Sequence, residues 1–156
     1  MTSSANVDSS SRYRDEAGQF LSVMGEVASE LCLDYSKESL QRLDQFISDN
    51  FEPVGSKAIA DSLLQGIGCY LGEVIIRNLG GEWDESGKPE IVGLSTLPPI
   101  QPIEKAHQRF QNGRQDSLAW YYHSLAKKAY EMEAANNPPQ NNEGGLFGFL
   151  SSLFKK

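Results

Sequence analysis

The chain is poor in the residues that most often carry chemistry or cross-link a small fold. Its 156 residues include two cysteines and two histidines. Two cysteines cannot form the disulfide framework of a small secreted protein, so we expect a reducing, cytoplasmic location. No run approaches the roughly 18 apolar residues of a membrane-spanning helix. The first residues also lack the basic-then-apolar pattern of a secretory signal.

Basic residues are scarce as well, with 14 Lys and Arg against 21 Asp and Glu. Residues 14–136 hold 11 basic and 19 acidic side chains, whereas 1–13 are neutral and 137–156 carry a net charge of +1. A nucleic-acid-binding surface needs clustered Lys and Arg to displace counterions from phosphates. The charge distribution therefore predicts no nucleic-acid partner.

The composition divides the chain into four regions. Residues 1–12 are Ser-rich and too polar to offset the entropy of ordering, so we expect them to be disordered. Residues 13–135 show helical periodicity and are predicted to form a single compact domain. Residues 136–145, NNPPQNNEGG, are typical of a flexible linker, and residues 146–156 form a separate amphipathic peptide.

The periodicity of the compact domain predicts an α+β, mostly helical fold, with five helices and a β-hairpin between the third and the fourth. The helices are expected over 13–33, 37–51, 57–79, 102–112 and 117–135, with N-caps at Ser36, Ser56 and Asp116. In the first helix the expected inward stripe is Phe20, Met24, Val27 and Leu31. The third helix is the richest in apolar residues, so we expect it to be central.

Gly66, Gly68 and Gly72 lie within this third helix. Their G-x-G-x-x-x-G spacing differs from the dinucleotide-binding fingerprint, and no Gly-Lys-Ser/Thr of a phosphate loop follows. Glycines inside a helix let another segment approach closely, so a packing role is favoured over a ligand role. Glu73 and Arg77, four residues apart, are expected to form a helical ion pair, and the alternative is a buried partner for Glu73.

The same region carries a family resemblance. The segment 66–83, GIGCYLGEVIIRNLGGEW, is followed by a Gly-containing turn, a Pro-rich loop and KAHQRFQNGRQDSL. This pattern resembles a family of small bacterial domains of unknown function, with LG-x-Y-x-GE, then GG-x-W, then N-G-x-x-D-S-L. The resemblance covers about residues 55–125 and implies helices around a small sheet, with no assigned activity. The positions it points to are Gly68, Tyr70, Gly72, Glu73, Gly81 and Trp83.

No catalytic residue can be named from the sequence. Cys32 and Cys69 lie among apolar residues, where a cysteine usually behaves as a small buried hydrophobe. A reactive thiol needs an electropositive, accessible setting, so pairing with His107 or His123 is disfavoured. HxxxH, HExxH and CxxC patterns are lacking, and we expect no metal and no cofactor.

Lys105, Arg109 and Arg114 form a basic cluster in an acidic body, with Lys105 and Arg109 expected to point outward. Guanidinium groups bind anions or acidic partners through forked hydrogen bonds, which makes the cluster a candidate anion site. The favoured alternative is a solvated face that pairs with surrounding carboxylates, because exposed charge groupings are common and individually weak. An enzyme or ligand binder would add Glu73, Trp83 and His107 to one cleft.

The strongest functional signal is the peptide 146–156, LFGFLSSLFKK, in which six of eleven residues are large and apolar. As a helix it would carry one apolar stripe. Eleven residues hardly form a helix alone in water, so the stripe needs a surface to bury against. A groove on a protein partner is favoured over the chain's own body, because the linker gives reach, and over a membrane surface, because two lysines attract anionic lipid weakly. The predicted partner-binding residues are Leu146, Phe147, Phe149, Leu150, Leu153 and Phe154.

Together these features predict a non-enzymatic interaction or adaptor module with a tethered docking peptide. The first alternative is an enzyme or small-anion binder that uses a cleft near Glu73, Trp83 and Arg109. The second is an immunity-type inhibitor, in which an acidic surface covers the basic site of a toxin.

Overall fold

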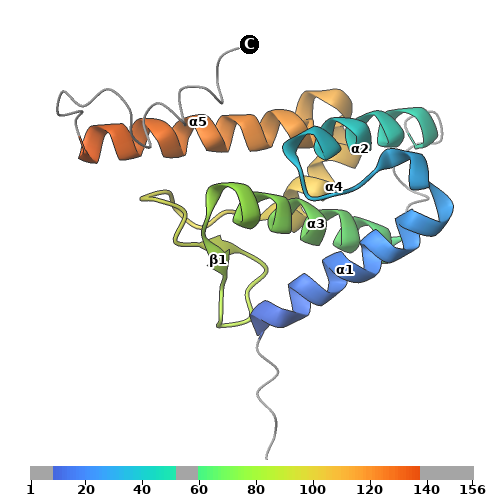
Figure 1. Cartoon of the computed structure of the whole chain (residues 1–156), viewed down its shortest axis with the longest axis horizontal. Helices are drawn as coiled ribbons and strands as arrows, with labels where there is room; N and C mark the ends of the chain where they lie inside the picture. The colour runs from blue at the N-terminus through green and yellow to red at the C-terminus, as the bar shows by residue number, and fades with distance from the viewer. Residues whose placement is uncertain (1–8, 52–59, 138–156) are drawn as a thin grey trace, which may run out of the picture.

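The computed structural model describes residues 9–51 and 60–137, and within these ranges it confirms the mostly helical α+β class (Figure 1). The two 3-10 helices are η1 (Ser29–Leu31) and η3 (Gly113–Asp116). The hairpin strands β1 (Glu82–Trp83) and β2 (Ile91–Val92) lie between the third and fourth α-helices, as predicted. The α-helices are α1 (Ser9–Val27), α2 (Lys37–Asn50), α3 (Asp61–Leu79), α4 (Pro102–Asn112) and α5 (Leu118–Asn136).

Helix α3 is the centre of the fold, which confirms the prediction from its dense apolar pattern. Every residue from Gly66 to Ile75 is buried. Helices α1 and α4 pack against α3, while α2 packs mainly against α5. In Figure 1, α2 and α5 lie above α3, and α1 and the hairpin lie below it. The helices therefore cover α3 from several sides, and its buried charged residue, Glu73, must find partners inside the protein.

Helix α1 differs from its prediction at both ends. It begins at Ser9, inside the segment predicted to be disordered, and it ends at Val27. Its buried stripe is Tyr13, Ala17, Phe20 and Met24. Val27 was predicted to point inward but is 69% exposed, and the buried residue at this end of the helix is Ala28, after which η1 brings Leu31 to the core.

The predicted N-caps have different outcomes. Ser36 caps α2, since its Oγ accepts the backbone N–H of Ser39 at 3.1 Å. Ser56 lies in 52–59, outside the described residues, and α3 begins at Asp61. The cap of α5 is Ser117 and not Asp116: the Ser117 Oγ accepts the N–H of Trp120. The Asp116 carboxylate instead binds Lys105.

The hairpin is short but extended by a third segment. Trp83 pairs with Ile91 and Glu82 with Val92, and Ile91 also exchanges two backbone hydrogen bonds with Ile100. This pairing fixes Trp83 at a position where its side chain reaches α3. No helix within the described ranges combines the length and the apolar character needed to cross a membrane.

Candidate functional site

Three of the motif residues, Gly72, Glu73 and Trp83, meet in one buried contact. Trp83 is 1% exposed, and its Nε1–H donates to Glu73 Oε1 at 3.0 Å. A β-carbon on residue 72 would overlap the Trp83 ring, so only glycine leaves room for the indole at this point of α3. Tyr13 of α1 packs against the same ring with centroids 4.7 Å apart. The spacing of Gly72-Glu73 and Trp83 therefore serves the packing of the hairpin on α3.

The second oxygen of Glu73 is also engaged. Arg77 Nε donates to Glu73 Oε2 at 3.2 Å, which gives the predicted ion pair between residues four apart. Glu73 is buried, so both alternatives from the sequence hold together: the ion pair and the buried partner. Arg77 is half-exposed, and its guanidinium lies 3.6 Å from the centre of the Tyr35 ring. Glu73 thus acts as a shared acceptor between a strand and its own helix.

The other glycines of α3 have the packing role that was predicted. A β-carbon on Gly68 would lie 2.5 Å from the Cα of Ile103, so α4 crosses α3 at this residue with backbone nearly in contact. A β-carbon on Gly66 would lie 2.9 Å from the Phe20 ring of α1. The glycine pattern marks where two helices and an indole meet α3.

The basic cluster is arranged differently from its prediction. Lys105 and Arg109 were expected to point outward, but both are buried, and Arg109 is only 1% exposed. Lys105 Nζ lies 2.5 Å from Asp116 Oδ1, and Arg109 Nε lies 2.9 Å from Asp44 Oδ1. The expected pairing with carboxylates is therefore present, but the expected solvated face is wrong, because the partner carboxylates lie on the side of α4 that faces the protein.

Asp44 of α2 organizes this junction and belongs to no sequence motif. Its Oδ1 accepts hydrogen bonds from Arg109 Nε and from the N–H of Leu118, at 2.9 and 3.0 Å. Its Oδ2 accepts from the hydroxyl of Ser117 and the N–H of Ala119, at 2.7 and 2.9 Å. These amides belong to the first turn of α5. The N–H groups of a first turn have no carbonyl acceptors within the helix, and the helix N-terminus favours a negative charge. One carboxylate thus joins α2, α4 and α5.

A sequence signal for Asp44 does exist. It lies four residues after Leu40 and three before Ile47, both of which are fully buried on the inner face of α2. A carboxylate on that face needs a partner inside the protein, because burying an unpaired charge is costly. Arg109 has the same signal, since it lies three residues after the buried Ala106. The two charges are 65 residues apart, and nothing local pairs them.

A polar hollow of about 470 Å³ lies between α2 and α5 over this junction. Arg109 Nη2 and Arg114 Nε both donate to the hydroxyl of Ser48, at 2.8 and 3.2 Å. The side chain of Trp120, 65% exposed, and that of His123 line the hollow from α5. Glu73 and Trp83 instead lie in their own buried contact with α1 and α3. The predicted site residues are therefore divided between two places in the fold.

The thiols have partners other than imidazole. Cys69 is buried and its Sγ donates to Glu16 at 3.6 Å. Burial raises the pKa of the Cys69 thiol, and the nearby Glu16 adds to the rise, so the reactive thiolate is disfavoured. Cys32 was predicted to be buried but is exposed after η1, where its Sγ lies 3.7 Å from the Ser29 carbonyl oxygen. Among the described residues, no group of three or more His, Cys, Asp and Glu could hold a metal ion.

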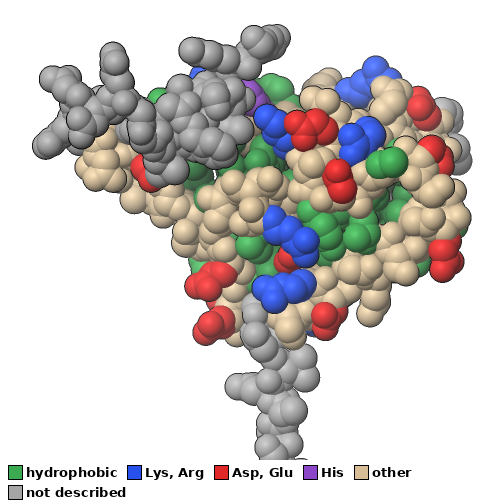
Figure 2. Space-filling model, viewed as in Figure 1, with side chains coloured by type: hydrophobic (Ala, Val, Ile, Leu, Met, Phe, Trp, Pro, Cys, Tyr) green, Lys and Arg blue, Asp and Glu red, His purple; other side chains and the backbone are tan. Residues whose placement is uncertain are grey.

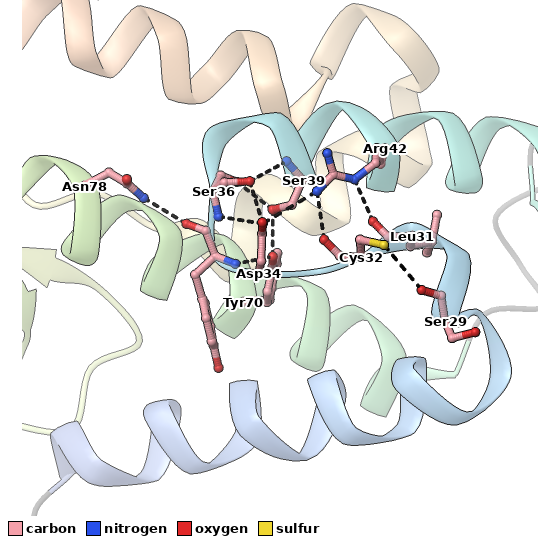
Figure 3. Close-up of polar contacts among 10 residues, drawn as sticks. Ser29, Leu31, Cys32, Asp34, Ser36, Ser39, Arg42, Tyr70 and Asn78 are labelled. Carbon is pink, nitrogen blue, oxygen red and sulfur yellow. Dashed lines mark hydrogen bonds and ion pairs between the residues drawn. The ribbon is translucent and has the colours of Figure 1, made fainter.

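A third polar cluster fixes the segment between η1 and α2 (Figure 3). Cys32 and Tyr35 have positive φ angles of 47° and 61°, a costly conformation for residues with a side chain. Arg42 donates to the carbonyl oxygen of Cys32 at 2.7 Å, and Asn78 donates to that of Tyr35 at 2.9 Å. The Tyr70 hydroxyl accepts the N–H of Tyr35 at 3.0 Å. Tyr70, another motif residue, therefore anchors this segment to α3.

The surface shown in Figure 2 has acidic and basic side chains interspersed, with hydrophobic side chains between them over α3. The Lys and Arg side chains do not join into one patch on this face. The predicted partner-binding residues lie outside the described residues, as does the linker from 138 onward. These residues are Leu146, Phe147, Phe149, Leu150, Leu153 and Phe154.

Comparison with protein-family models finds no matching family, and comparisons with curated proteins and with solved structures find no similar chain. The resemblance to the bacterial family of unknown function therefore stays a prediction. The function has to be argued from the residues.

Proposed function

We propose that this chain is a non-enzymatic, cytoplasmic interaction module that uses the peptide 146–156 to bind a protein partner. One observation carries the proposal: the side chains of the body that would do chemistry are already bound to one another. Glu73 is occupied by Trp83 and Arg77, and Arg109 is occupied by Asp44. Within the described residues, every buried side-chain nitrogen and oxygen has a hydrogen-bond partner.

A body of this kind supports a binding role for the peptide. Each large apolar side chain of the peptide contributes about 1.5–3 kcal/mol when fully buried, a gain that only another surface provides. The stripe from Leu146 to Phe154 has the spacing by which an amphipathic helix binds a groove. The net negative charge of residues 14–136 opposes binding to an anionic membrane, which favours a protein surface.

Removing 146–156 tests the proposal. We expect the melting temperature of the dilute chain to stay within about 2 °C of the full-length value, because the buried polar side chains of residues 9–51 and 60–137 already have their hydrogen-bond partners without the peptide. A fall of more than about 4 °C, roughly 1 kcal/mol in a chain of this size, would instead make the peptide part of its own core and contradict the proposal. Differential scanning calorimetry measures the change.

Binding is tested with matched variants of the full chain. Leu150→Ser with Phe154→Ser removes apolar anchors of the stripe, and Ser151→Ala with Ser152→Ala changes the opposite face. We expect the first pair to lose an isolated partner and the second pair to keep it, because burial of the stripe provides the affinity. Equal loss in both pairs would contradict helix-in-groove binding.

A second candidate function is anion binding in the hollow between α2 and α5. The observation that favours it is the convergence of Arg109 and Arg114 on Ser48, with the exposed Trp120 beside them. Titration with inorganic phosphate, followed by NMR of the Trp120 indole N–H, tests it. We expect a saturable shift that Arg114→Gln removes and that Arg12→Gln, on the distant α1, leaves unchanged. No shift in the unsubstituted chain would reject this function.

A further inference from the structure

An apolar groove lies between α1 and the first turns of α3. It has a volume of about 580 Å³, and Phe20, Val23, Leu63 and Gly66 form its apolar lining. Val23 is 57% exposed, and Val27 follows one turn later on the same helix. Valine side chains left in water at successive turns favour covering by another apolar surface. The groove therefore has the character of a docking site for an amphipathic segment.

The charges around the groove identify the chemistry of its occupant. The charged side chain in the lining is Glu16, which pairs with Arg12 one turn earlier on α1. Glu26 lies three residues after Val23 on the same helix, and α3 starts with the exposed Asp61, directly before the lining residue Ser62. The peptide 146–156 ends in Lys155 and Lys156, directly after its apolar stripe. An apolar helix with a basic end complements an apolar groove with an acidic rim. As a helix, the eleven residues would be about 16 Å long.

The position of α5 decides which copy the peptide reaches. In Figure 1 the end of α5 and the start of α3 lie at opposite ends of the long axis of the molecule. The connecting residues 138–145 are eight in number and span at most about 26–29 Å. Helix α5, with 19 residues, is itself about 28 Å long and leads away from the groove. For the peptide to return to the groove of its own copy, the fully extended residues 138–145 would only just span the length of α5.

We propose that residues 146–156 of one copy dock as an amphipathic helix in the α1–α3 groove of a second copy. This inference rests on the proposed function and names the partner as the same chain. Because peptide and groove are different surfaces, each contact pairs the peptide of one copy with the groove of the other. Two copies that exchange peptides make the contact twice and form a closed dimer, and the second contact forms at the high effective concentration set by the first.

A complementation experiment with the full chain tests this, with sedimentation equilibrium as the measurement. Val23→Glu blocks the groove but keeps the peptide, and Leu150→Glu blocks the peptide but keeps the groove. Each variant alone is expected to weaken self-association by more than about tenfold, since a carboxylate is poorly tolerated in an apolar contact. Mixed in equal amounts, the two variants are expected to form a one-to-one complex, because one peptide and one groove remain intact.

The matched control is Met132→Glu, the same kind of change at an exposed hydrophobic residue on α5, outside the groove. It is expected to associate like the unsubstituted chain. Three results would overturn the proposal: an unsubstituted chain that stays monomeric at all concentrations, association that Val23→Glu leaves intact, or a mixture that does not associate. None of these affects the melting-temperature test above, so the failure of this inference is distinguishable from failure of the proposed function.

Discussion

Glu73 and Asp44 are two carboxylates that each join separate elements of the fold, but their partners differ in burial and in sequence distance. Glu73 binds the neutral indole of Trp83, ten residues away, and the half-exposed Arg77 on its own helix. Asp44 binds the buried Arg109, 65 residues away, and donors at the start of α5, 73 to 75 residues away. The Glu73 contact is local in the sequence, whereas the Asp44 contact joins elements that are far apart in the sequence.

The difference teaches where the fold depends on charge. If Glu73 were neutral, Trp83 would keep an oxygen to bind, and Arg77 would reach solvent. If Asp44 were neutral, the guanidinium of Arg109 would stay inside the protein and lose its ion pair with Asp44. Breaking a buried ion pair is far more costly than breaking an exposed one. We therefore expect stability to depend much more on the charge of Asp44 than on that of Glu73.

The substitution with the largest expected effect on stability is Asp44→Asn. The amide has nearly the same shape but breaks the buried ion pair with Arg109 and presents an NH₂ group to backbone amides that need an acceptor. We expect a loss of about 3–5 kcal/mol in the free energy of unfolding, the usual range for one broken half of a buried ion pair. Urea denaturation monitored by circular dichroism measures it.

Glu73→Gln is the matched control for that change. Its amide oxygen still accepts the Trp83 indole N–H, so the main change is the lost ion pair with Arg77. The expected loss in the free energy of unfolding is about 1 kcal/mol, the value of an ordinary hydrogen bond. Equal losses in the two variants would show that the charge of the acceptor is unimportant and would remove the distinction between the two junctions.

A smaller loss of stability, confined to the contact between α3 and the hairpin near Glu73, is expected for Gly72→Ala. The added methyl group overlaps the Trp83 ring, so hairpin and helix must move apart at a cost of about 1–3 kcal/mol. Gly18→Ala in α1 is the control, since nothing lies within 4 Å of its added carbon. There alanine should stabilise the chain by up to about 1 kcal/mol through helix propensity. Thermal unfolding of both variants gives the signs, and a stabilising Gly72→Ala would refute the close packing.

The smallest expected effect concerns pH. A hydrogen bond from Lys105 and another from Asn112 hold the pKa of Asp116 below its usual value. A depressed carboxyl pKa contributes stability above the pKa of the unfolded chain, and this contribution is lost as the pH falls through the folded pKa. Asp116→Asn should therefore flatten the decline of stability between about pH 5 and pH 3. Urea unfolding across that range measures the slope, and Glu85→Gln, in the exposed hairpin turn, should leave it unchanged.

Much of the fold was predictable because local patterns determine it. The central helix, the hairpin after it and the Ser36 cap follow from apolar periodicity, turn residues and a hydroxyl at a helix start. The packing role of Gly68 and Gly72 was predictable for the same reason, since a glycine inside a helix removes a side chain wherever another segment approaches.

The candidate site was predicted less well, because its charges pair across the chain. Lys105 and Arg109 look like an outer face when α4 is read alone, and only the fold brings Asp44 and Asp116 to them. Asp116 likewise lies one residue too early to cap α5, which begins at Leu118 with Ser117 as its N-cap, and it binds Lys105 instead. Long-range ion pairs select among local alternatives, and the sequence of one helix does not contain that choice.

The chain has two tryptophans, and they occupy opposite environments: Trp83 is sealed between α3 and Tyr13, whereas Trp120 faces solvent beside the polar hollow. Indole emission shifts to longer wavelength in water, so the two rings emit at separable wavelengths from the folded chain. The blue component reports whether the hairpin stays on α3, and the red component reports what approaches the hollow between α2 and α5. The molecule thus carries intrinsic optical reporters for its folding and for its surface, without any added label.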